Sequence, residues 1–250
     1  MPDSPLEGKV ALVTGGAHRL GAVIARTLHA HGMKLVIHYH ASEAAAHALQ
    51  QELQTARPDS VMLVRGDLRN GDKLYRNLIF ETVESFERLD VLVNNAARFY
   101  ETPLGDVSEE QWDDIFNTNL RAPFFLSQVA APHLKKTGGC IVNIVDLYAD
   151  RPLPNYPLYS MSKAGLSMMT RSLARELAPE VRVNAVAPGA ILWPEKGIDE
   201  MSKQRIISRT LLKRPGQPED IAATVLYLVR DAVYTTGQVL IVDGGRSVAV

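Results

Sequence analysis

The chain has 250 residues, of which 46% are hydrophobic and 22% are charged, and its formal net charge is -1. This composition is typical of a globular protein that buries a sizeable core. The near-neutral charge argues against an electrostatic grip on nucleic acid or on a membrane surface, because such partners require clustered basic residues.

Cysteine content and the apolar runs narrow the class further. Cys140 is the only cysteine and lies in an apolar run, so we expect a buried core thiol, no intrachain disulfide and no bound metal. The N-terminal segment lacks the basic start of a signal peptide. No apolar run approaches the roughly 18 residues that span a bilayer. We therefore expect a cytoplasmic protein.

Short β-branched runs alternate along the chain with longer amphipathic stretches. The predicted strands are Val10–Thr14, Lys34–His38, Val61–Arg65, Val91–Asn94, Cys140–Val145, Val181–Val186 and Val239–Val242. The predicted helices are Leu20–His31, Ser42–Ala56, Asp72–Arg88, Glu109–Lys135, Leu158–Leu177 and Pro218–Val229. Such alternation indicates parallel strands with crossover helices, and continuously apolar strands indicate a sheet covered on both faces. We predict one doubly wound α/β domain over residues 1–250, with a seven-stranded parallel sheet and helices on both faces.

A glycine-rich segment, Thr-Gly-Gly-Ala-His-Arg-Leu-Gly at residues 14–21, joins the first strand to the first helix. Glycines allow a tight turn and a close approach of the backbone to pyrophosphate, and the helix N-terminus supplies free N–H groups. We expect Gly15, Arg19 and Leu20 to bind a nucleotide. The Arg19 guanidinium can bind phosphate and also reach a substrate; the alternative is a solvated arginine at the start of a helix.

The second strand ends in His38-Tyr39-His40-Ala41-Ser42, and no acidic residue appears before Glu43. A cofactor without a 2′-phosphate usually meets an Asp or Glu at this point. Imidazoles and hydroxyls suit a 2′-phosphate better than a bare ribose diol, so His38, Tyr39, His40 and Ser42 favour NADPH over NADH. The segment contains no Arg or Lys, and ordinary surface histidines are the alternative.

Polar residues also follow the other predicted strands. They are Asp67, Asn94-Asn95, Asp146 and Pro188-Gly189. In an open α/β sheet, ligands bind in the crevice along the carboxyl ends of the strands. This clustering predicts a bound cofactor independently of any single motif.

Tyr159 and Lys163 are four residues apart, which places both side chains on one face of a helix. A phenol is a poor acid near neutral pH because its unperturbed pKa is about 10. A nearby ammonium favours the phenolate and brings the phenol closer to useful proton transfer. The pair therefore predicts a proton-delivery device, with Asp146 thirteen residues before the tyrosine.

Together these elements resemble the short-chain dehydrogenase/reductase family over nearly the whole chain, including the terminal Val242-Asp243-Gly244-Gly245. The resemblance implies a Rossmann-type fold and commonly a homotetramer. It also implies a role for each matching residue. Asp67 and Leu68 would hold adenine, Asn94 and Ala96 would line the cleft, Asn119 would position Lys163 through a helix distortion, Lys163 would bind the nicotinamide ribose, and Pro188 and Gly189 would lie against the nicotinamide.

The chain departs from the general family pattern at Arg19, which replaces a glycine, and at Asp146, which replaces a serine. Both departures, with His38-Tyr39-His40 and the segment 94–100, resemble the pteridine reductase and dihydromonapterin reductase branch. One difference from that branch is Ala41, where an arginine commonly helps to bind the 2′-phosphate.

The aspartate bears on the substrate. An ionised carboxylate only accepts hydrogen bonds, so Asp146 would repel a developing alkoxide unless it is neutral. A pterin presents N–H donors, and reduction of its C=N bond needs a proton that Asp146 and Tyr159 can relay. We expect Phe99 to stack on the ring, Arg19 to donate to it, and Trp193, in a substrate lid at about residues 190–213, to close over it. Core packing for Phe99, a backbone cap for Asp146 and an ordinary surface insertion for 190–213 are the alternatives.

The sequence thus leads to NADPH-dependent reduction of pterins, from dihydropterin to tetrahydropterin and including dihydrofolate, with Asp146, Tyr159, Lys163 and Asn119 as the catalytic group. The first alternative is a reductase of the same fold that acts on a sugar, steroid or 3-ketoacyl carbonyl. The second is a non-catalytic nucleotide-binding protein, which the presence of both Tyr159 and Lys163 disfavours.

Overall fold

The computed structural model describes residues 6–193 and 199–249, which form one seven-stranded parallel sheet. The strand order is β3-β2-β1-β4-β5-β6-β7. The strands are β1 Val10–Val13, β2 Lys34–Tyr39, β3 Val61–Arg65, β4 Val91–Asn94, β5 Cys140–Ile144, β6 Arg182–Pro188 and β7 Val239–Val242. The predicted fold class is therefore confirmed, with every predicted strand present.

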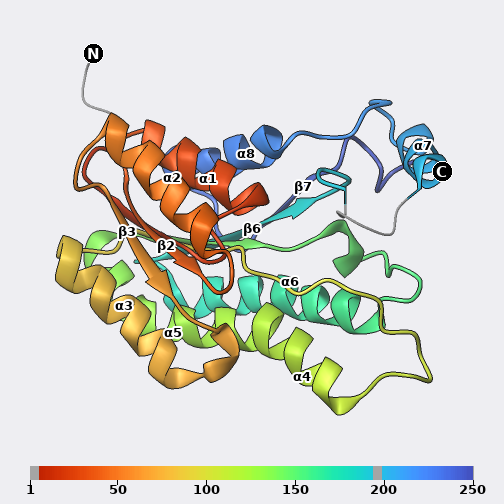
Figure 1. The fold of residues 1–250 in the computed structure, drawn as a ribbon, viewed down its shortest axis with the longest axis horizontal. Helices are drawn as coiled ribbons and strands as arrows, with labels where there is room; N and C mark the ends of the chain where they lie inside the picture. Colours follow the sequence, from red (N-terminus) through yellow and green to blue (C-terminus); the bar gives the residue numbers. More distant parts are fainter. Residues whose placement is uncertain (1–5, 194–198, 250) are drawn as a thin grey trace.

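Helices cover both faces of the sheet (Figure 1). One face carries α1 Arg19–Ala30, α2 Glu43–Ala56 and α8 Pro218–Arg230, and the other carries α3 Asp72–Phe86, α4 Glu109–Phe116, α5 Ala122–Thr137 and α6 Pro157–Leu177. Shorter helical segments are η1 Leu68–Asn70, η2 Asn117–Arg121, η3 Leu147–Ala149 and α7 Glu200–Ser208. This arrangement is the doubly wound architecture that parallel strands with crossover helices require.

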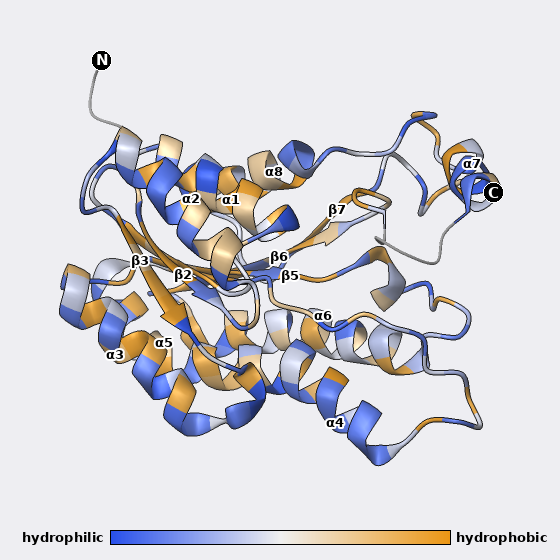
Figure 2. Ribbon diagram, in the orientation of Figure 1, coloured by the Kyte–Doolittle hydropathy of each residue, from blue (hydrophilic) through white to orange (hydrophobic). Residues whose placement is uncertain are grey.

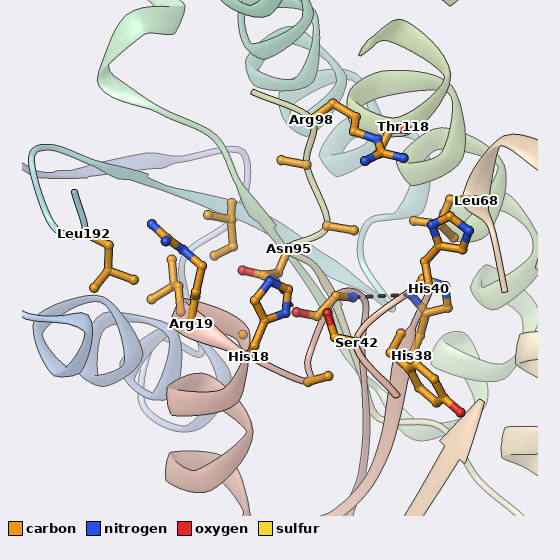
Figure 3. Close-up of a pocket in the computed structure, with 18 of the residues that line it drawn as sticks. His18, Arg19, His38, His40, Ser42, Leu68, Asn95, Arg98, Thr118 and Leu192 are labelled. Atoms are coloured by element: carbon orange, nitrogen blue, oxygen red, sulfur yellow. Dashed lines mark hydrogen bonds between the residues drawn. The ribbon is translucent and has the colours of Figure 1, made fainter. Parts of the chain in front are cut away.

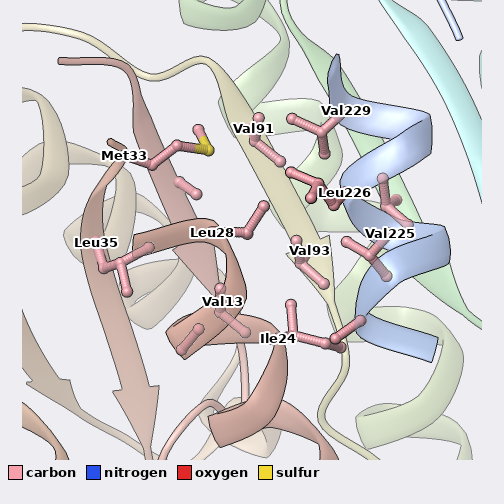
Figure 4. Close-up of a cluster of buried hydrophobic side chains, with 14 of the residues drawn as sticks. Val13, Ile24, Leu28, Met33, Leu35, Val91, Val93, Val225, Leu226 and Val229 are labelled. Carbon is pink, nitrogen blue, oxygen red and sulfur yellow. The ribbon is translucent and has the colours of Figure 1, made fainter. Parts of the chain in front are cut away.

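The apolar residues of the strands and of the inward helix faces form the core. Figure 2 shows the sheet as a hydrophobic layer between helices that carry both hydrophobic and hydrophilic residues. In Figure 4, Ile24 and Leu28 of α1 and Val225 of α8 pack over Val13 and Val93 of the sheet. All five side chains are fully buried, and burial of each stabilises the fold by about 1.5–3 kcal/mol. This packing fixes α1, and hence the glycine-rich turn before it, against the carboxyl ends of the strands.

The predicted helix Glu109–Lys135 is wrong in one respect. It consists of α4 and α5 joined by a π-helical segment, Asn117–Arg121, in which the Ala122 N–H donates to the Asn117 carbonyl. Pro123 has no N–H to give to the carbonyl of Asn119, and its ring opposes a regular turn there. A wider π turn accommodates both effects.

The order of the strands places a crevice beside β1. The chain runs outward from β1 to β2 and β3, and then returns to place β4 on the other side of β1. Such a switch point is where open α/β sheets bind ligands. Figure 1 shows the glycine-rich turn and the loops after β4 and β5 at this edge.

Other expectations concern the remainder of the fold. Cys140 is buried as predicted, and burial raises the pKa of its thiol to about 11. Within residues 6–193 and 199–249, no helix is long and apolar enough to cross a membrane, and no group of three or more His, Cys, Asp or Glu side chains is placed to hold a metal. Within the proposed lid, at about residues 190–213, the structure has the short helix α7. Part of the proposed lid, residues 194–198, lies outside the described residues.

Candidate active site

The glycine-rich turn forms a cradle that only small residues permit. Gly15 has a φ of 60°, and a Cβ added there would lie 3.0 Å from the Cα of Ala96. Helix α1 begins without a side-chain cap and without an acidic residue in its first turn. Its first N–H groups are therefore available to a phosphate, and the positive end of the helix dipole favours one. The cradle fits the pyrophosphate of a dinucleotide.

The His38 side chain holds the backbone of this turn in place through a hydrogen bond to Gly15. Its Nδ1 accepts a hydrogen bond from the Gly15 N–H at 3.3 Å (dashed in Figure 3), so its Nε2 carries the proton and donates to the Gly66 carbonyl at 3.0 Å. The side chain is 2% exposed, and burial lowers its pKa to about 4. Both ring nitrogens are engaged by backbone. The ring of His38 therefore acts as a brace for the turn, and not as the phosphate donor that the sequence suggested.

The cleft above the brace has a volume of about 520 Å³ and gathers most of the predicted site. The predicted residues that line it are Gly15, Arg19, Leu20, His38, Tyr39, His40, Ser42, Asp67, Leu68, Ala96, Asp146, Tyr159, Lys163, Pro188 and Gly189. Residues to which the sequence assigned no individual role complete it, namely Ala17, His18, Gly21, Ala41, Asn95, Ala97, Arg98, Thr118, Ile144, Val145, Ile191 and Leu192. Most of these directly adjoin predicted ones, so proximity to a strand end was the available signal.

Asn94 is a correction to the predicted cofactor site. It is buried in the sheet, where its Nδ2 donates to Asn143 Oδ1 at 2.8 Å, and it is not among the cleft residues. The next residue, Asn95, lines the cleft instead and donates from Nδ2 to the carbonyls of Thr14 and Gly15. Side chains alternate along a strand, so adjacent asparagines at its end necessarily serve different sides.

The end of the cleft beside β2 carries an ion-paired carboxylate. Arg69 donates to Asp67 at 2.6 Å, and this hydrogen bond, more than the opposing burial, lowers the pKa of Asp67 to about 2. His40 Nε2 lies 3.6 Å from Asp67 Oδ2 and is partly exposed. The nearest acid after β2, Glu43, pairs with Arg65 at 3.2 Å. The end of β2 therefore presents an imidazole and hydroxyls to the cleft.

Asp146 and Tyr159 form a direct hydrogen-bonded pair at the other end of the cleft. The Tyr159 hydroxyl donates to Asp146 Oδ2 at 2.7 Å, while Asp146 Oδ1 accepts from the Tyr148 N–H at 2.9 Å. The aspartate is thus both a cap for η3 and the partner of the tyrosine. One oxygen fixes the carboxylate and the other holds the phenol in place.

Lys163 lies beneath this pair. Its Nζ donates to the Ile144 carbonyl at 2.8 Å and lies 5.8 Å from the centre of the Tyr159 ring. Burial lowers the pKa of the ammonium to about 8, against the opposing charge of Asp146.

The protonation of the pair differs from the prediction that Lys163 makes the phenol acidic. Burial, and then the charge and hydrogen bond of Asp146, raise the pKa of Tyr159 well above that of a free phenol. Burial also raises the pKa of Asp146, against the hydrogen bonds it accepts from Tyr148 and Tyr159. Desolvation disfavours every charged form here, so it outweighs the ammonium. Tyr159 is therefore held protonated and arranged as a proton donor.

Asn119 is linked to the Asp146–Tyr159 pair only indirectly, through Ser162 and the backbone of α6. It lies in the π segment η2, its Oδ1 accepts from the Arg98 N–H at 2.7 Å, and its Nδ2 donates to the Arg98 carbonyl and to Ser162 Oγ, each at 3.0 Å. Ser162 precedes Lys163 in α6. Asn119 thus ties the loop after β4 to the helix that carries Lys163, without touching the lysine in the described structure.

Of the residues predicted to bind the substrate, Arg19 lines the cleft, whereas Phe99 and Trp193 do not. Arg19 lies in the cleft, extends toward Leu192 (Figure 3), and donates to the Trp193 carbonyl at 3.1 Å. The Phe99 ring stacks on Tyr156, with ring centres 4.7 Å apart, and meets the Tyr159 ring edge to face. Neither Phe99 nor Trp193 is among the cleft-lining residues, and their contacts with a substrate stay predictions.

Comparison with known proteins agrees with this geometry. Residues 15–247 match the family model described as enoyl-(acyl carrier protein) reductase. The chain is 37% identical to an uncharacterized oxidoreductase of Methylorubrum extorquens, with 97% of this chain and 99% of that protein covered. It is 37% identical to the 3-oxoacyl-[acyl-carrier-protein] reductase of Synechocystis (96% and 97% covered), and 35% identical to pteridine reductase 1 of Leishmania tarentolae (95% and 96% covered).

The chain therefore belongs to the short-chain dehydrogenase/reductase family. It is an oxidoreductase of the kind that uses a nicotinamide cofactor and acts on a small molecule. Its similarity to a pteridine reductase and to a 3-oxoacyl reductase is nearly the same, so the comparisons do not choose between these substrates.

Proposed function

We propose that this reductase transfers a hydride from NADPH to a C=N bond of a dihydropterin, with Tyr159 as the proton donor. The observation that carries the proposal is the 2.7 Å hydrogen bond between the Tyr159 hydroxyl and Asp146 Oδ2. The two side chains form a proton-relay unit at the end of the cleft where Lys163, Pro188 and Gly189 also lie.

The described residues fit a dinucleotide cofactor, which supplies the hydride when bound. The cradle at Gly15 and the uncapped start of α1 would hold the pyrophosphate. Lys163 would donate to the nicotinamide ribose, and Gly189 would lie against the nicotinamide. His40 and Ser42, with no acid between them in the sequence, support a cofactor with a 2′-phosphate over one with a free diol.

Asp146 supports a nitrogen heterocycle over a ketone. A ketone that accepts hydride becomes an alkoxide, and a carboxylate beside it opposes that charge. A pterin instead presents N–H donors that a carboxylate accepts, and its reduced nitrogen takes up a proton. Since burial raises the pKa of Asp146, the carboxylate can take up a proton from solvent after the phenol has given its own to the substrate nitrogen. Transfer of that proton to the Tyr159 phenolate restores both the phenol and the carboxylate.

A second candidate, reduction of a 3-oxoacyl carbonyl, is favoured by a different observation. The matching family model and one of the similar proteins carry names of acyl-carrier-protein reductases. If Asp146 is neutral in the cofactor complex, the repulsion of an alkoxide disappears, and Tyr159 could protonate a carbonyl oxygen. The two candidates share the cofactor and the tyrosine, and differ in what Asp146 does.

A substrate panel tests the proposal. Purified protein with NADPH would be given dihydrobiopterin, dihydromonapterin, dihydrofolate and a 3-oxoacyl thioester, and loss of NADPH absorbance would be followed. We expect turnover of at least one pterin with a higher kcat/KM than the thioester. Turnover of the thioester alone would replace the proposal with the second candidate. Binding of NADPH with no turnover on either class would support a non-catalytic protein.

Substitution of Asp146 distinguishes the two chemistries more sharply. Asp146→Asn keeps the shape and an acceptor for the Tyr159 hydroxyl, while Asp146→Ser supplies a hydroxyl donor. We expect each to lower kcat on the pterin by about 100-fold, within the range for loss of a general acid–base partner. If Asp146→Ser instead gained pterin activity, the electrostatic argument for the aspartate would be wrong.

We also propose a homotetramer, as the family resemblance implies. Phe124 of α5, Met161 and Met168 of α6 and Ile241 of β7 are large apolar side chains exposed on the single chain, and a subunit interface would cover them. Light scattering tests this assembly, and a monomer at micromolar concentration would contradict it.

A further inference from the structure

A second cavity lies beside the catalytic pair, and its polar lining is basic. It has a volume of about 490 Å³ and is lined by Leu147, Tyr148, Arg151, Pro152, Leu153, Pro154, Arg209, Arg246 and Ala249. These residues come from three separate parts of the chain, namely the segment after β5, the end of α7 and the C-terminal residues. Figure 1 shows the last residues beside α7. Among the residues that the structure describes, no acidic side chain lines the cavity.

The three arginines have no carboxylate partner within the described residues. Each of the ion pairs found there involves other side chains, and the one ring contact among the three is that of Arg246, whose guanidinium carbon lies 5.7 Å from the centre of the Tyr148 ring. Arginine is over-represented where planar, bidentate binding of carboxylate or phosphate matters. Three of them converging on one cavity, without an internal counter-ion, leave a site for an anion.

Tyr148 connects this cavity to the chemistry. Its backbone N–H binds Asp146 Oδ1 at 2.9 Å, and its side chain forms part of the cavity wall. Arg246 is near enough for its charge to lower the pKa of Asp146, although burial has the larger and opposite effect. The arginine cavity and the Asp146–Tyr159 pair are therefore separated by little more than one aromatic side chain.

We infer that this cavity is a subsite for the anionic tail of the substrate, a carboxylate joined to the reacting ring through a flat apolar spacer. The inference rests on the proposed function for the identity of the ring. Leu147, Leu153 and the Tyr148 face supply an apolar wall for the spacer, and Arg151, Arg209 and Arg246 supply donors for the carboxylate. A substrate without a negative tail gains nothing from these residues.

A binding experiment tests the subsite without requiring turnover. Full-length protein saturated with NADPH would be titrated calorimetrically with p-aminobenzoyl-L-glutamate, and with its uncharged diamide as the matched ligand. We expect the dianion to bind and the diamide to bind at least about tenfold more weakly, as loss of charge-assisted hydrogen bonds implies. Equal binding of the two ligands, or no binding of either, would overturn the inference.

Variants assign the binding to the arginines. Arg151→Gln/Arg209→Gln should weaken the dianion about tenfold and leave the diamide unchanged. The control is Arg205→Gln, an exposed arginine of α7 that does not line the cavity, and it should bind the dianion as the unsubstituted protein does. Equal losses in the double variant and in the control would indicate a general charge effect and refute the subsite.

Steady-state kinetics separates this inference from the proposed function. With dihydrofolate, which carries a glutamate tail, the double variant should raise KM about tenfold at constant kcat, whereas dihydrobiopterin should be unaffected. If pterins are reduced but the double variant treats the two substrates alike, the subsite is wrong and the proposed function stands. If the dianion binds as predicted but no pterin is reduced, the subsite stands and the proposed ring is wrong.

Discussion

The two ends of the cleft differ in the charge properties of their buried side chains. At the glycine-rich turn, the groups that shape the cradle are neutral and hydrogen-bonded to backbone, as His38 is to Gly15 and Gly66. At the catalytic end, Asp146, Tyr159 and Lys163 are ionisable, buried and shifted in pKa. A binding cradle must keep its shape while pH varies, whereas a proton relay must contain groups that can change charge.

The same difference determines how substitutions at the two ends of the cleft should affect stability and catalysis. A buried neutral imidazole with both nitrogens satisfied adds stability, whereas a buried ionisable cluster reduces it unless function requires the cluster. We therefore expect substitutions at the cradle to act on stability and cofactor affinity together. Substitutions at the catalytic end should act mainly on kcat.

The largest effect should come from removing the proton donor. Tyr159→Phe deletes the hydroxyl that donates to Asp146 and keeps the ring that packs on Phe99. We expect kcat to fall about 100-fold to 10,000-fold, as for loss of a general acid, with the NADPH dissociation constant within about twofold. Steady-state kinetics and fluorescence titration measure both quantities, and full turnover in this variant would refute the assigned role.

The next effect should come from the brace beneath the cradle. His38→Gln leaves the Gly15 N–H and the Gly66 carbonyl without well-aligned hydrogen-bond partners. The free energy of unfolding should therefore fall by about 2–3 kcal/mol, as for buried polar groups that lose their partners. NADPH should bind more weakly as well. Urea unfolding and cofactor titration measure these effects. His47→Gln, on the exposed face of α2, is the control, and equal effects of the two substitutions would contradict the brace.

The same histidine predicts a pH dependence. Its folded-state pKa, about 4, lies below the ordinary value of 6.5. The unfolded chain therefore binds the proton more readily, and the stability that neutral His38 contributes is present above pH 6.5 and is lost as pH falls toward 4. Between pH 7 and pH 5 the stability advantage over His38→Gln should shrink by about 2 kcal/mol. An advantage that stays constant over this range would mean that His38 is not held neutral.

A smaller effect should follow from crowding the cleft at Gly189, which we propose lies against the nicotinamide. A Cβ added at Gly189 would lie 2.6 Å from the Cα of Asp243, which is backbone and cannot move aside freely. Gly189→Ala should reduce stability by about 1–3 kcal/mol, as for overpacking. Gly165→Ala in α6 would meet only the Leu120 side chain and should be tolerated. Urea unfolding of both variants tests the difference, which should favour Gly165→Ala.

The smallest effect concerns the charge of Lys163. Since burial lowers its pKa to about 8, the ammonium that would hold the ribose is lost as pH rises through that value. NADPH should bind up to about tenfold more weakly at pH 9 than at pH 7. Lys163→Arg stays charged over this range and should show a flat profile. A flat profile in the unsubstituted protein would show that the lysine charge is not needed for cofactor binding.

The sequence by itself determined the fold and most of the residues of the cleft. Period, composition and strand-helix alternation fix the layers of a doubly wound sheet, and parallel strands bring their carboxyl ends to one edge. Gly15, Asp146 and Gly189 could therefore be assigned to one site because each follows a strand. Tyr159 and Lys163 lie one helical turn apart, and the family resemblance assigned them to the same site.

Only the tertiary structure decided what each side chain does there. Whether Asn94 or Asn95 faces the cleft depends on where the strand ends, and whether His38 binds phosphate or braces a turn depends on the backbone groups opposite it. Burial, which no local sequence pattern reports, reversed the expected effect on Tyr159. The arginine cavity joins Arg151, Arg209 and Arg246, which come from three separate segments of the chain, so long-range packing alone brings its charges together.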